Sequence, residues 1–153
     1  ERDLDDMIAY EDGGYKIKVD RINFDLYKAK IREDAHQNLD QVVDILKQYP
    51  NMVIKIESHT DARGDDQYNE RLSISRAKAT RAYILAQGID PRQIKSSIGY
   101  GEKKLLNDCG NGVPCPEDLH DENRRSEFII LNFDTERSRY TSSPDFEDEE
   151  FED

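Results

Sequence analysis

The sequence has no tryptophan, only 2 cysteines and no apolar stretch near the roughly 20 residues that a helix needs to cross a bilayer. It also lacks a basic run, and its 34 acidic residues outnumber the 22 Lys and Arg to give a formal net charge of -12. A chain this acidic repels phosphate groups, so nucleic acid is excluded as a partner. A signal peptide and an initial Met are both missing. We therefore expect a processed chain or a fragment, attached to a membrane only through a missing upstream segment.

The length of 153 residues suits one compact domain with a modest tail. Residues 1–14 are acidic, end at a pair of glycines and are predicted to be a leader. Periodic apolar segments follow, which predicts a single domain at 15–134. This pattern stops at Thr135, and the last nine residues are almost wholly acidic. Residues 135–153 are therefore predicted to be a flexible, solvated tail.

Apolar periodicity predicts the order of helices and strands. Alternation of apolar and polar residues predicts strands at 15–19, 52–58, 94–98 and 125–133. The same alternation at 22–26 indicates a second strand or a continuation of the first. Helical spacing predicts amphipathic helices at 33–48 and 66–87, which Pro50 and Gly88 terminate. The segment 99–123 is expected to be an irregular loop. This order predicts an α+β fold of the βαβαββ type, a sandwich with its helices packed on one face of a mixed four-stranded sheet.

The two cysteines, Cys109 and Cys115, are separated by five residues that include glycine and proline. Such a loop turns tightly and can bring the two sulfurs together. A disulfide is favoured over two free thiols, and it implies an oxidising compartment such as the periplasm. The spacing is not Cys-x-x-Cys, which argues against zinc and thioredoxin-like chemistry.

The second predicted helix carries an arginine where an apolar residue is expected. On a helical wheel Arg76 lies in the apolar arc beside Leu72 and Tyr83, with Asn69 on the same face. A guanidinium keeps its charge, and burying it without a partner is costly, so Arg76 needs an anion. The residues allow a salt bridge to Asp61 that locks the preceding loop, or a clamp in which Asp61 holds an ammonium group and Arg76 a carboxylate. The residue pattern alone favours the salt bridge.

The stretch from Ile54 to Tyr83 resembles the OmpA-like C-terminal domain, the family of the OmpA, Pal and MotB type. The resemblance continues downstream and covers about residues 15–134. The matching motifs are His59-Thr60-Asp61, Gly64, Tyr68-Asn69, Leu72-Ser73, Arg76-Ala77, Gly99-Tyr100-Gly101-Glu102 and Asn123-Arg124-Arg125.

This resemblance implies non-covalent binding of peptidoglycan through the diaminopimelate of its peptide stem. The residues that it implicates are Asp61 and Arg76 as the clamp, and Thr60, Asn69 and Leu72 as the lining. It also implicates one arginine of the Asn-Arg-Arg motif nearby, Arg124 or Arg125. Adjacent strand residues face opposite sides, so only one of the two can face the site, and Arg124 is the preferred candidate. The resemblance also implies a periplasmic anchor that ties an outer-membrane protein of a Gram-negative cell to the cell wall.

Two alternatives stay open at this point. The same pocket could anchor a motor stator or a secretion machine. The domain could instead be a protein-interaction module of such an envelope complex, with a purely structural Asp61–Arg76 pair.

No catalytic or cofactor-binding pattern stands out. Ser58, His59 and Asp61 are adjacent at one strand end, where side chains diverge, so they are not expected to form a triad. The three histidines are too dispersed for a metal motif, and His59 is expected to order its loop. Arg63-Gly64-Asp65 matches an adhesion tripeptide but is explained better by the turn at Gly64. We therefore expect neither an enzyme nor a cofactor.

Overall fold

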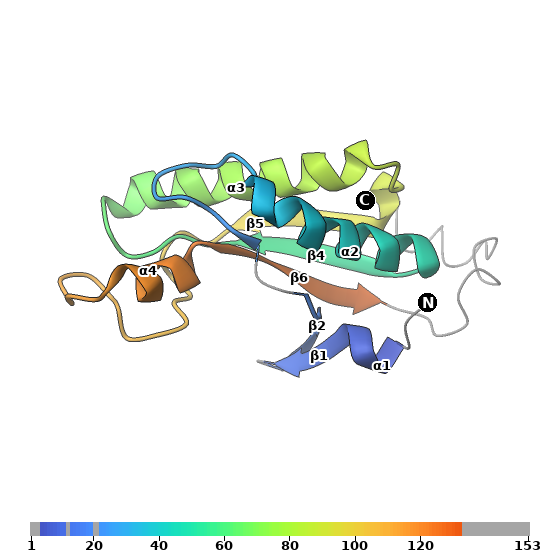
Figure 1. The fold of residues 1–153 in the computed structure, drawn as a ribbon, viewed down its shortest axis with the longest axis horizontal. Helices are drawn as coiled ribbons and strands as arrows, with labels where there is room; N and C mark the ends of the chain where they lie inside the picture. Colours follow the sequence, from blue (N-terminus) through green and yellow to red (C-terminus); the bar gives the residue numbers. More distant parts are fainter. Residues whose placement is uncertain (1–3, 12, 20–21, 133–153) are drawn as a thin grey trace.

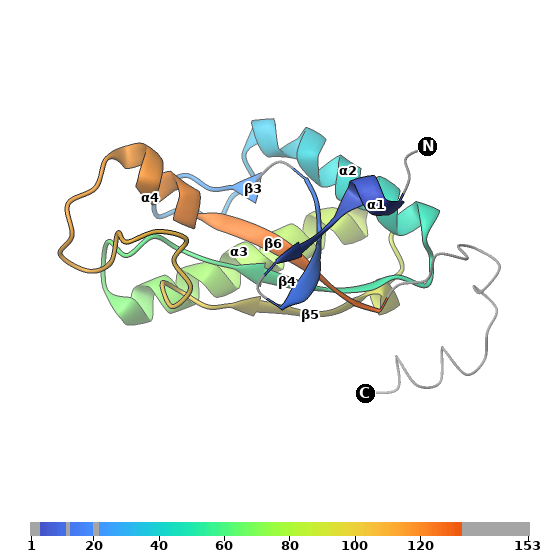
Figure 2. The same cartoon turned by 90° about the horizontal axis from the view of Figure 1, so that it is seen from below.

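The computed structural model describes residues 4–11, 13–19 and 22–132, which form an α+β sandwich. Two helices, α2 (His36–Gln48) and α3 (Asp66–Ala86), cover one face of a sheet whose longest strands are β4 (Val53–Ser58), β5 (Ile94–Gly99) and β6 (Arg125–Asn132) (Figures 1 and 2). The predicted fold class is confirmed.

The sheet is mixed and has 6 strands, in the order β1-β2-β6-β4-β5, with β3 also paired to β6. Its other strands are β1 (Ile8–Glu11), β2 (Gly14–Ile17) and β3 (Ile22–Asn23). The pair β4–β5 is parallel and all other pairs are antiparallel.

The sheet differs from the predicted four strands at its N-terminal edge. There β1 pairs with β2 across Gly13, whose φ of 81° permits the tight turn, so residues 8–11, which lie in the predicted leader, form an edge strand of the sheet. The short helix α1 (Leu4–Met7) precedes β1, and Met7 is buried in the core. The strand β1 was not predicted because the segment 1–14 around it is acidic, and because an edge strand pairs with one neighbour only.

The predicted helices and strands from residue 33 onwards agree with the structure to within two residues, except in the loop 99–123. The helix at 33–48 begins as the 3-10 turn η1 (Glu33–Ala35) and continues as α2, and a second 3-10 turn, η2 (Pro91–Gln93), precedes β5. The expectation of an irregular loop was wrong at α4 (Glu117–Asn123). This helix is only 7 residues long, and periodicity cannot reveal so short an element. The predicted tail at 135–153 lies outside the described residues.

The core lies between the sheet and the two long helices. The stripe of α2 supplies Leu39, Val42 and Leu46, and the inward faces of β4 and β6 supply Ile54, Ile56, Phe128 and Ile130. One arginine, Arg76, is among the largest fully buried side chains. Within the part of the chain that the structure describes, no helix combines the length and the apolar character that membrane crossing requires.

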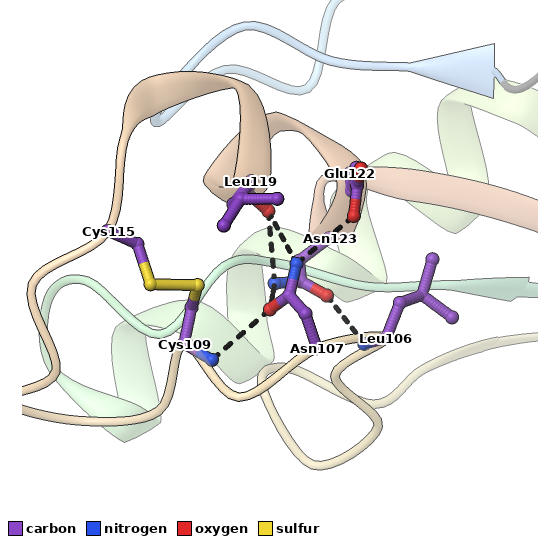
Figure 3. Close-up of a disulfide and its surroundings, with 7 residues drawn as sticks. All are labelled: Leu106, Asn107, Cys109, Cys115, Leu119, Glu122 and Asn123. Atoms are coloured by element: carbon purple, nitrogen blue, oxygen red, sulfur yellow. Dashed lines mark hydrogen bonds between the residues drawn. A yellow bond between two sulfur atoms is a disulfide. The ribbon is translucent and has the colours of Figure 1, made fainter.

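The disulfide between Cys109 and Cys115 is present, which confirms the prediction (Figure 3). Asn107 fastens its loop to α4: Nδ2 donates to the carbonyl oxygen of Leu119 at 2.9 Å, and Oδ1 accepts from the backbone N–H of Cys109 at 3.2 Å and from Nδ2 of Asn123 at 3.0 Å. The loop and the short helix therefore form one unit beside the end of the sheet.

Candidate functional site

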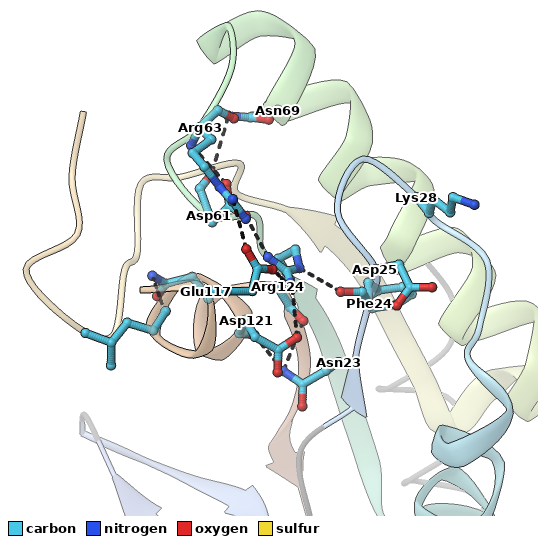
Figure 4. A network of polar contacts seen from close by, with 12 residues as sticks. Asn23, Phe24, Asp25, Lys28, Asp61, Arg63, Asn69, Glu117, Asp121 and Arg124 are labelled. Atoms are coloured by element: carbon cyan, nitrogen blue, oxygen red, sulfur yellow. Dashed lines mark hydrogen bonds and ion pairs between the residues drawn. The ribbon is translucent and has the colours of Figure 1, made fainter. Parts of the chain in front are cut away.

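The predicted site residues come from three segments that meet where β4 ends and β6 begins (Figure 4). The chain leaves β4 at Ser58 and turns at Gly64, whose φ is 98°. It then enters α3, where the carboxylate of Asp65 caps the helix by accepting the backbone N–H of Tyr68 at 3.0 Å. This turn places Asp61 opposite Arg124, which precedes β6.

Asp61 is buried, with 2% of its surface exposed, and is held between two guanidinium groups. Its Oδ2 accepts from Nη2 of Arg63 at 2.9 Å and from Nη1 of Arg124 at 3.0 Å, and its Oδ1 accepts the backbone N–H of Arg63 at 2.9 Å. Burial by itself raises the pKa of this carboxyl, but the hydrogen bonds from Arg63 and Arg124 outweigh burial and leave the pKa lowered. Asp61 is therefore an anion at neutral pH.

Arg124 joins Asp61 to α4. Its Nη2 donates to Glu117 at 2.8 Å and to Asp121 at 2.9 Å, and its Nε donates to the carbonyl oxygen of Phe24 at 2.8 Å. We call Asp61, Arg63, Glu117, Asp121 and Arg124 the end cluster. It contains three carboxylates and two guanidinium groups, linked by hydrogen bonds in the geometry that makes ion pairs strong.

Arg125 takes no part in the end cluster. Its Nε donates to Glu127 at 2.7 Å and its Nη2 donates to the carbonyl oxygen of Lys104 at 3.0 Å. Adjacent strand residues face opposite sides, so the two neighbouring arginines enter different networks. Of the two, only Arg124 contacts Asp61 in the structure.

Arg76 is fully buried and its hydrogen bonds go to backbone carbonyl groups. Nε donates to Lys28 at 2.8 Å, Nη1 to His59 at 3.0 Å and Nη2 to Asp25 at 2.9 Å, while the ring of Phe24 lies 5.0 Å from the guanidinium carbon. Burial, reinforced by the positive charge of Arg124, lowers the pKa of Arg76 to about 10, which still leaves it charged at neutral pH.

The direct salt bridge to Asp61, which the residue pattern alone favoured, is not formed. Among the described residues no carboxylate pairs with Arg76. Its charge is held by peptide dipoles and an aromatic face instead. The site therefore has a buried cation without an ionic partner, directly behind the end cluster.

Two of the other predicted lining residues, Asn69 and Thr60, lie at the Asp61 loop. Asn69 donates through Nδ2 to the carbonyl oxygen of Arg63 at 3.0 Å and to the carboxylate of Glu102 at 3.1 Å. Thr60 donates its backbone N–H to Gly101 at 2.9 Å, but its Oγ1 is buried without a hydrogen-bond partner. Leu72 is half-buried on α3. These contacts hold the loop in place and leave one hydroxyl available.

Sequence reasoning missed the residues that cover and complete this site. Arg63 was seen only as part of a turn, and Glu117 and Asp121 lie on the unpredicted α4. The prediction at 22–26 placed residues 25 and 26 in a strand, yet the segment 25–28 lies across Arg76 and accepts two of its hydrogen bonds. Within it, Tyr27 is the one described non-glycine residue with a positive φ, 59°, and its ring packs edge-on against Tyr68. A left-handed residue in this segment has no sequence signature.

The three residues that could have suggested a hydrolase diverge. Ser58 shares a 2.6 Å hydrogen bond with Ser126, which in turn contacts Thr80 of α3 at 3.0 Å. His59 points to the other face of the sheet and stacks on Tyr100 at a centroid distance of 5.6 Å. Neither contacts Asp61, so these three do not form a nucleophile and base pair.

The sequence of the chain is similar to that of known proteins. The profile of the OmpA family matches residues 23–114. The chain is 37% identical over 111 residues to the peptidoglycan-associated lipoprotein of Agrobacterium fabrum, covering 72% of this chain and 59% of that protein. It is 33% identical over 94 residues to outer membrane porin F of Pseudomonas aeruginosa, covering 61% of this chain and 26% of that protein. The chain thus spans about three-fifths of the first relative and a smaller part of the second.

Solved structures share the fold. The peptidoglycan-associated lipoprotein of Burkholderia pseudomallei has a TM-score of 0.65 at 26% identity, over 74% of this chain and 90% of that one. The cell wall anchor of the type VI secretion system of Pseudomonas aeruginosa has a TM-score of 0.59 at 20% identity, over 82% of this chain and 88% of that one.

Proposed function

Because the chain belongs to the OmpA family, we propose that it binds peptidoglycan without catalysis and anchors an envelope protein to the cell wall. Relatives named as peptidoglycan-associated lipoproteins and a structural neighbour named as a cell wall anchor support this proposal. The proposed location is the periplasm, attached to the outer membrane of a Gram-negative cell. The disulfide is consistent with an oxidising compartment.

We propose further that the ligand is the diaminopimelate of the stem peptide. Its side chain ends in an ammonium and a carboxylate, so a site that reads it must present an anion and a cation together. Asp61 is an ionised, buried carboxylate flanked by Arg63 and Arg124, and this is the observation that carries the proposal. The ammonium would replace a guanidinium at Asp61, and the carboxylate would take the released guanidinium donors.

Arg76 could contact a ligand carboxylate only if the segment that covers it moved. Its three donor groups are occupied by carbonyl oxygens and none of its surface is exposed. A ligand carboxylate can reach it only where the segment 25–28 gives way. Arg124 already contacts Asp61, so we assign the first carboxylate contact to Arg124 and a supporting electrostatic role to Arg76. Thr60, Asn69 and Leu72 keep their proposed place in the lining.

The proposal is tested by co-sedimentation with purified sacculi that contain diaminopimelate. Wild type is expected to pellet, and Asp61→Asn and Arg124→Gln are each expected to weaken binding by at least about tenfold, because each strands a buried charge. Arg125→Gln is the matched control: it removes the same side chain one position along, on the other face of the sheet. Sacculi with lysine in place of diaminopimelate should bind less well than the diaminopimelate type, since they lack the second carboxylate.

The competing function is a protein-interaction module of an envelope complex, such as a motor stator or secretion anchor, in which these charges serve only the fold. Thermal melts of every variant separate the two. Folded Asp61→Asn and Arg124→Gln proteins that still pellet like wild type would favour the interaction module. A wild-type protein that stays in the supernatant would remove wall binding altogether.

A further inference from the structure

On the face of the sheet opposite α3, two carboxylates stand side by side. Ser58 and Ser126 point toward α3, so their neighbours in β4 and β6 point away from it. Glu57 of β4 is directly paired with Glu127 of β6 in the antiparallel register. Like charges directly opposite each other on neighbouring strands destabilise a sheet unless a cation lies between them.

Next to this pair lies a histidine whose ring makes no hydrogen bond. His59 is 1% exposed, and both of its ring nitrogens are buried without a partner. A polar group that is buried unpaired costs about 1–3 kcal/mol, and such groups are rare in native structures. The stacking of its ring on Tyr100 fixes the plane of the ring and satisfies neither nitrogen.

These three side chains can share one ion. One donor atom from each of Glu57, His59 and Glu127 lies within 4.8 Å of the other two. We propose that they form a binding site for a divalent transition metal, with zinc as the best match. One imidazole nitrogen and two carboxylate oxygens are a donor set that zinc accepts, with a fourth position left for water. Donors on a tetrahedral zinc ion lie about 3.4 Å apart, so side-chain rotations would have to bring these atoms closer to complete the site.

An ion can reach the two carboxylates from solvent. A cleft of about 540 Å³ opens on this face and is lined by Glu57 and Glu127 together with Lys16, Lys55, Lys104 and Arg125. This volume exceeds what a hydrated ion needs. An ion in the cleft would therefore meet Glu57 and Glu127 first, and His59, which is 1% exposed, lies behind them.

The lysines of the cleft would compete with the metal. Lys55 lies 3.0 Å and Lys104 3.8 Å from Glu57, and Lys16 lies 2.9 Å from Glu127. Ammonium groups on flexible stems can leave when a divalent ion arrives, whereas Arg125 is buried and keeps one oxygen of Glu127. The lysines would thus substitute for the metal in its absence and set a threshold for its binding. Removing one of them should strengthen metal binding.

The test is a calorimetric titration of the purified chain with zinc chloride. In parallel, NMR spectra record the ring signals of its 3 histidines during the titration. Wild type is expected to bind one zinc ion and to shift the ring signals of His59 while those of His36 stay in place. His36 is exposed on α2 and serves as the internal control. Zinc held only by scattered surface carboxylates would leave the His59 signals unmoved and would overturn the proposal.

Variants make the assignment specific. Glu57→Gln and His59→Gln should each weaken zinc binding by at least about tenfold, Lys55→Gln should strengthen it about threefold, and His36→Gln should change nothing. Because His59→Gln also alters a buried position, Glu57→Gln provides an independent test in the open cleft, and thermal melts confirm that each variant is folded. Zinc affinity that is equal in wild type and Glu57→Gln, or weaker in Lys55→Gln, would refute the site.

Discussion

The two polar networks that flank the start of β6 differ in how their charges are paired, although each contains one of two adjacent arginines. In the end cluster, Arg124 shares its donors among Asp61, Glu117 and Asp121. On the other face, Arg125 donates to Glu127 beside a histidine whose imidazole has no hydrogen-bond partner. We call Glu57, His59 and Glu127 the open-face cluster.

The difference lies in what each network still needs. The end cluster is rich in mutual ion pairs, so a ligand can bind there only by exchanging with groups of the same charge. The open-face cluster has a buried imidazole that gains a partner from any ion that enters. Exchange favours selectivity, because a ligand must match two charges at once, whereas an unsatisfied donor set favours a small ion.

The largest expected effect comes from the cation behind the end cluster. Arg76→Met keeps much of the side-chain volume but leaves the carbonyl oxygens of Asp25, Lys28 and His59 without their donor. We expect the free energy of unfolding to fall by about 3–5 kcal/mol, because three carbonyl oxygens lose their donor at a cost of about 1–3 kcal/mol each. Chemical denaturation measures it. Lys78→Met, an exposed change on the same helix, is the control and should cost less than about 0.5 kcal/mol.

If Arg76→Met proved as stable as wild type and only lost wall binding, Arg76 would be a ligand-binding residue and not a support for the loop. That result would also reverse the ranking of Arg124 and Arg76 in the proposed clamp.

The sequence predicted the burial of Arg76, since the helical wheel placed it among apolar residues. It could not predict the acceptors, because two of them are backbone carbonyls of the segment 25–28, about fifty positions away, and carbonyls carry no residue signature. The alternation of strand residues predicted that Arg124 and Arg125 face opposite sides. Which of them meets Asp61 depends on the position of α4, a helix whose contacts with Asn107 are tertiary and invisible to periodicity.

The second expected effect is a loss of stability in acid, and the two clusters should lose their contributions in different pH ranges. Burial first, and then the positive charge of Arg125, lower the pKa of His59 to about 3, with Lys104 and Lys16 adding to this and Glu127 opposing it. In the unfolded chain the pKa of histidine is about 6.5, so the unfolded state takes up a proton that the folded state refuses. The contribution of His59 to the free energy of unfolding is therefore fully present above about pH 6.5. It is lost as the pH falls toward 3.

The slope of this loss should approach about 1.4 kcal/mol per pH unit, measured by denaturation in a chelating buffer. His59→Gln should flatten the slope between pH 6 and 4, whereas His36→Gln should leave it unchanged. The carboxylates act at lower pH: Asp61 and Glu127 have lowered pKa values, so their contributions are present above about pH 4.5 and are lost below it. A slope in His59→Gln equal to that of wild type would show that His59 does not stay neutral in the folded protein.

The smallest effect is expected from the disulfide, and it should fall on the end cluster alone. Cys109→Ser with Cys115→Ser removes a cross-link between residues separated by 6 positions, which costs about 2 kcal/mol in the chain-entropy account. The loop stays tied to α4 through Asn107, and α4 supplies Glu117 and Asp121 to Arg124. Loosening the loop should therefore weaken sacculus binding a few-fold while zinc binding at the open-face cluster, on the far side of the sheet, is unchanged. Equal losses at both sites would mean that the disulfide supports the whole domain, and the two clusters would then not be independent.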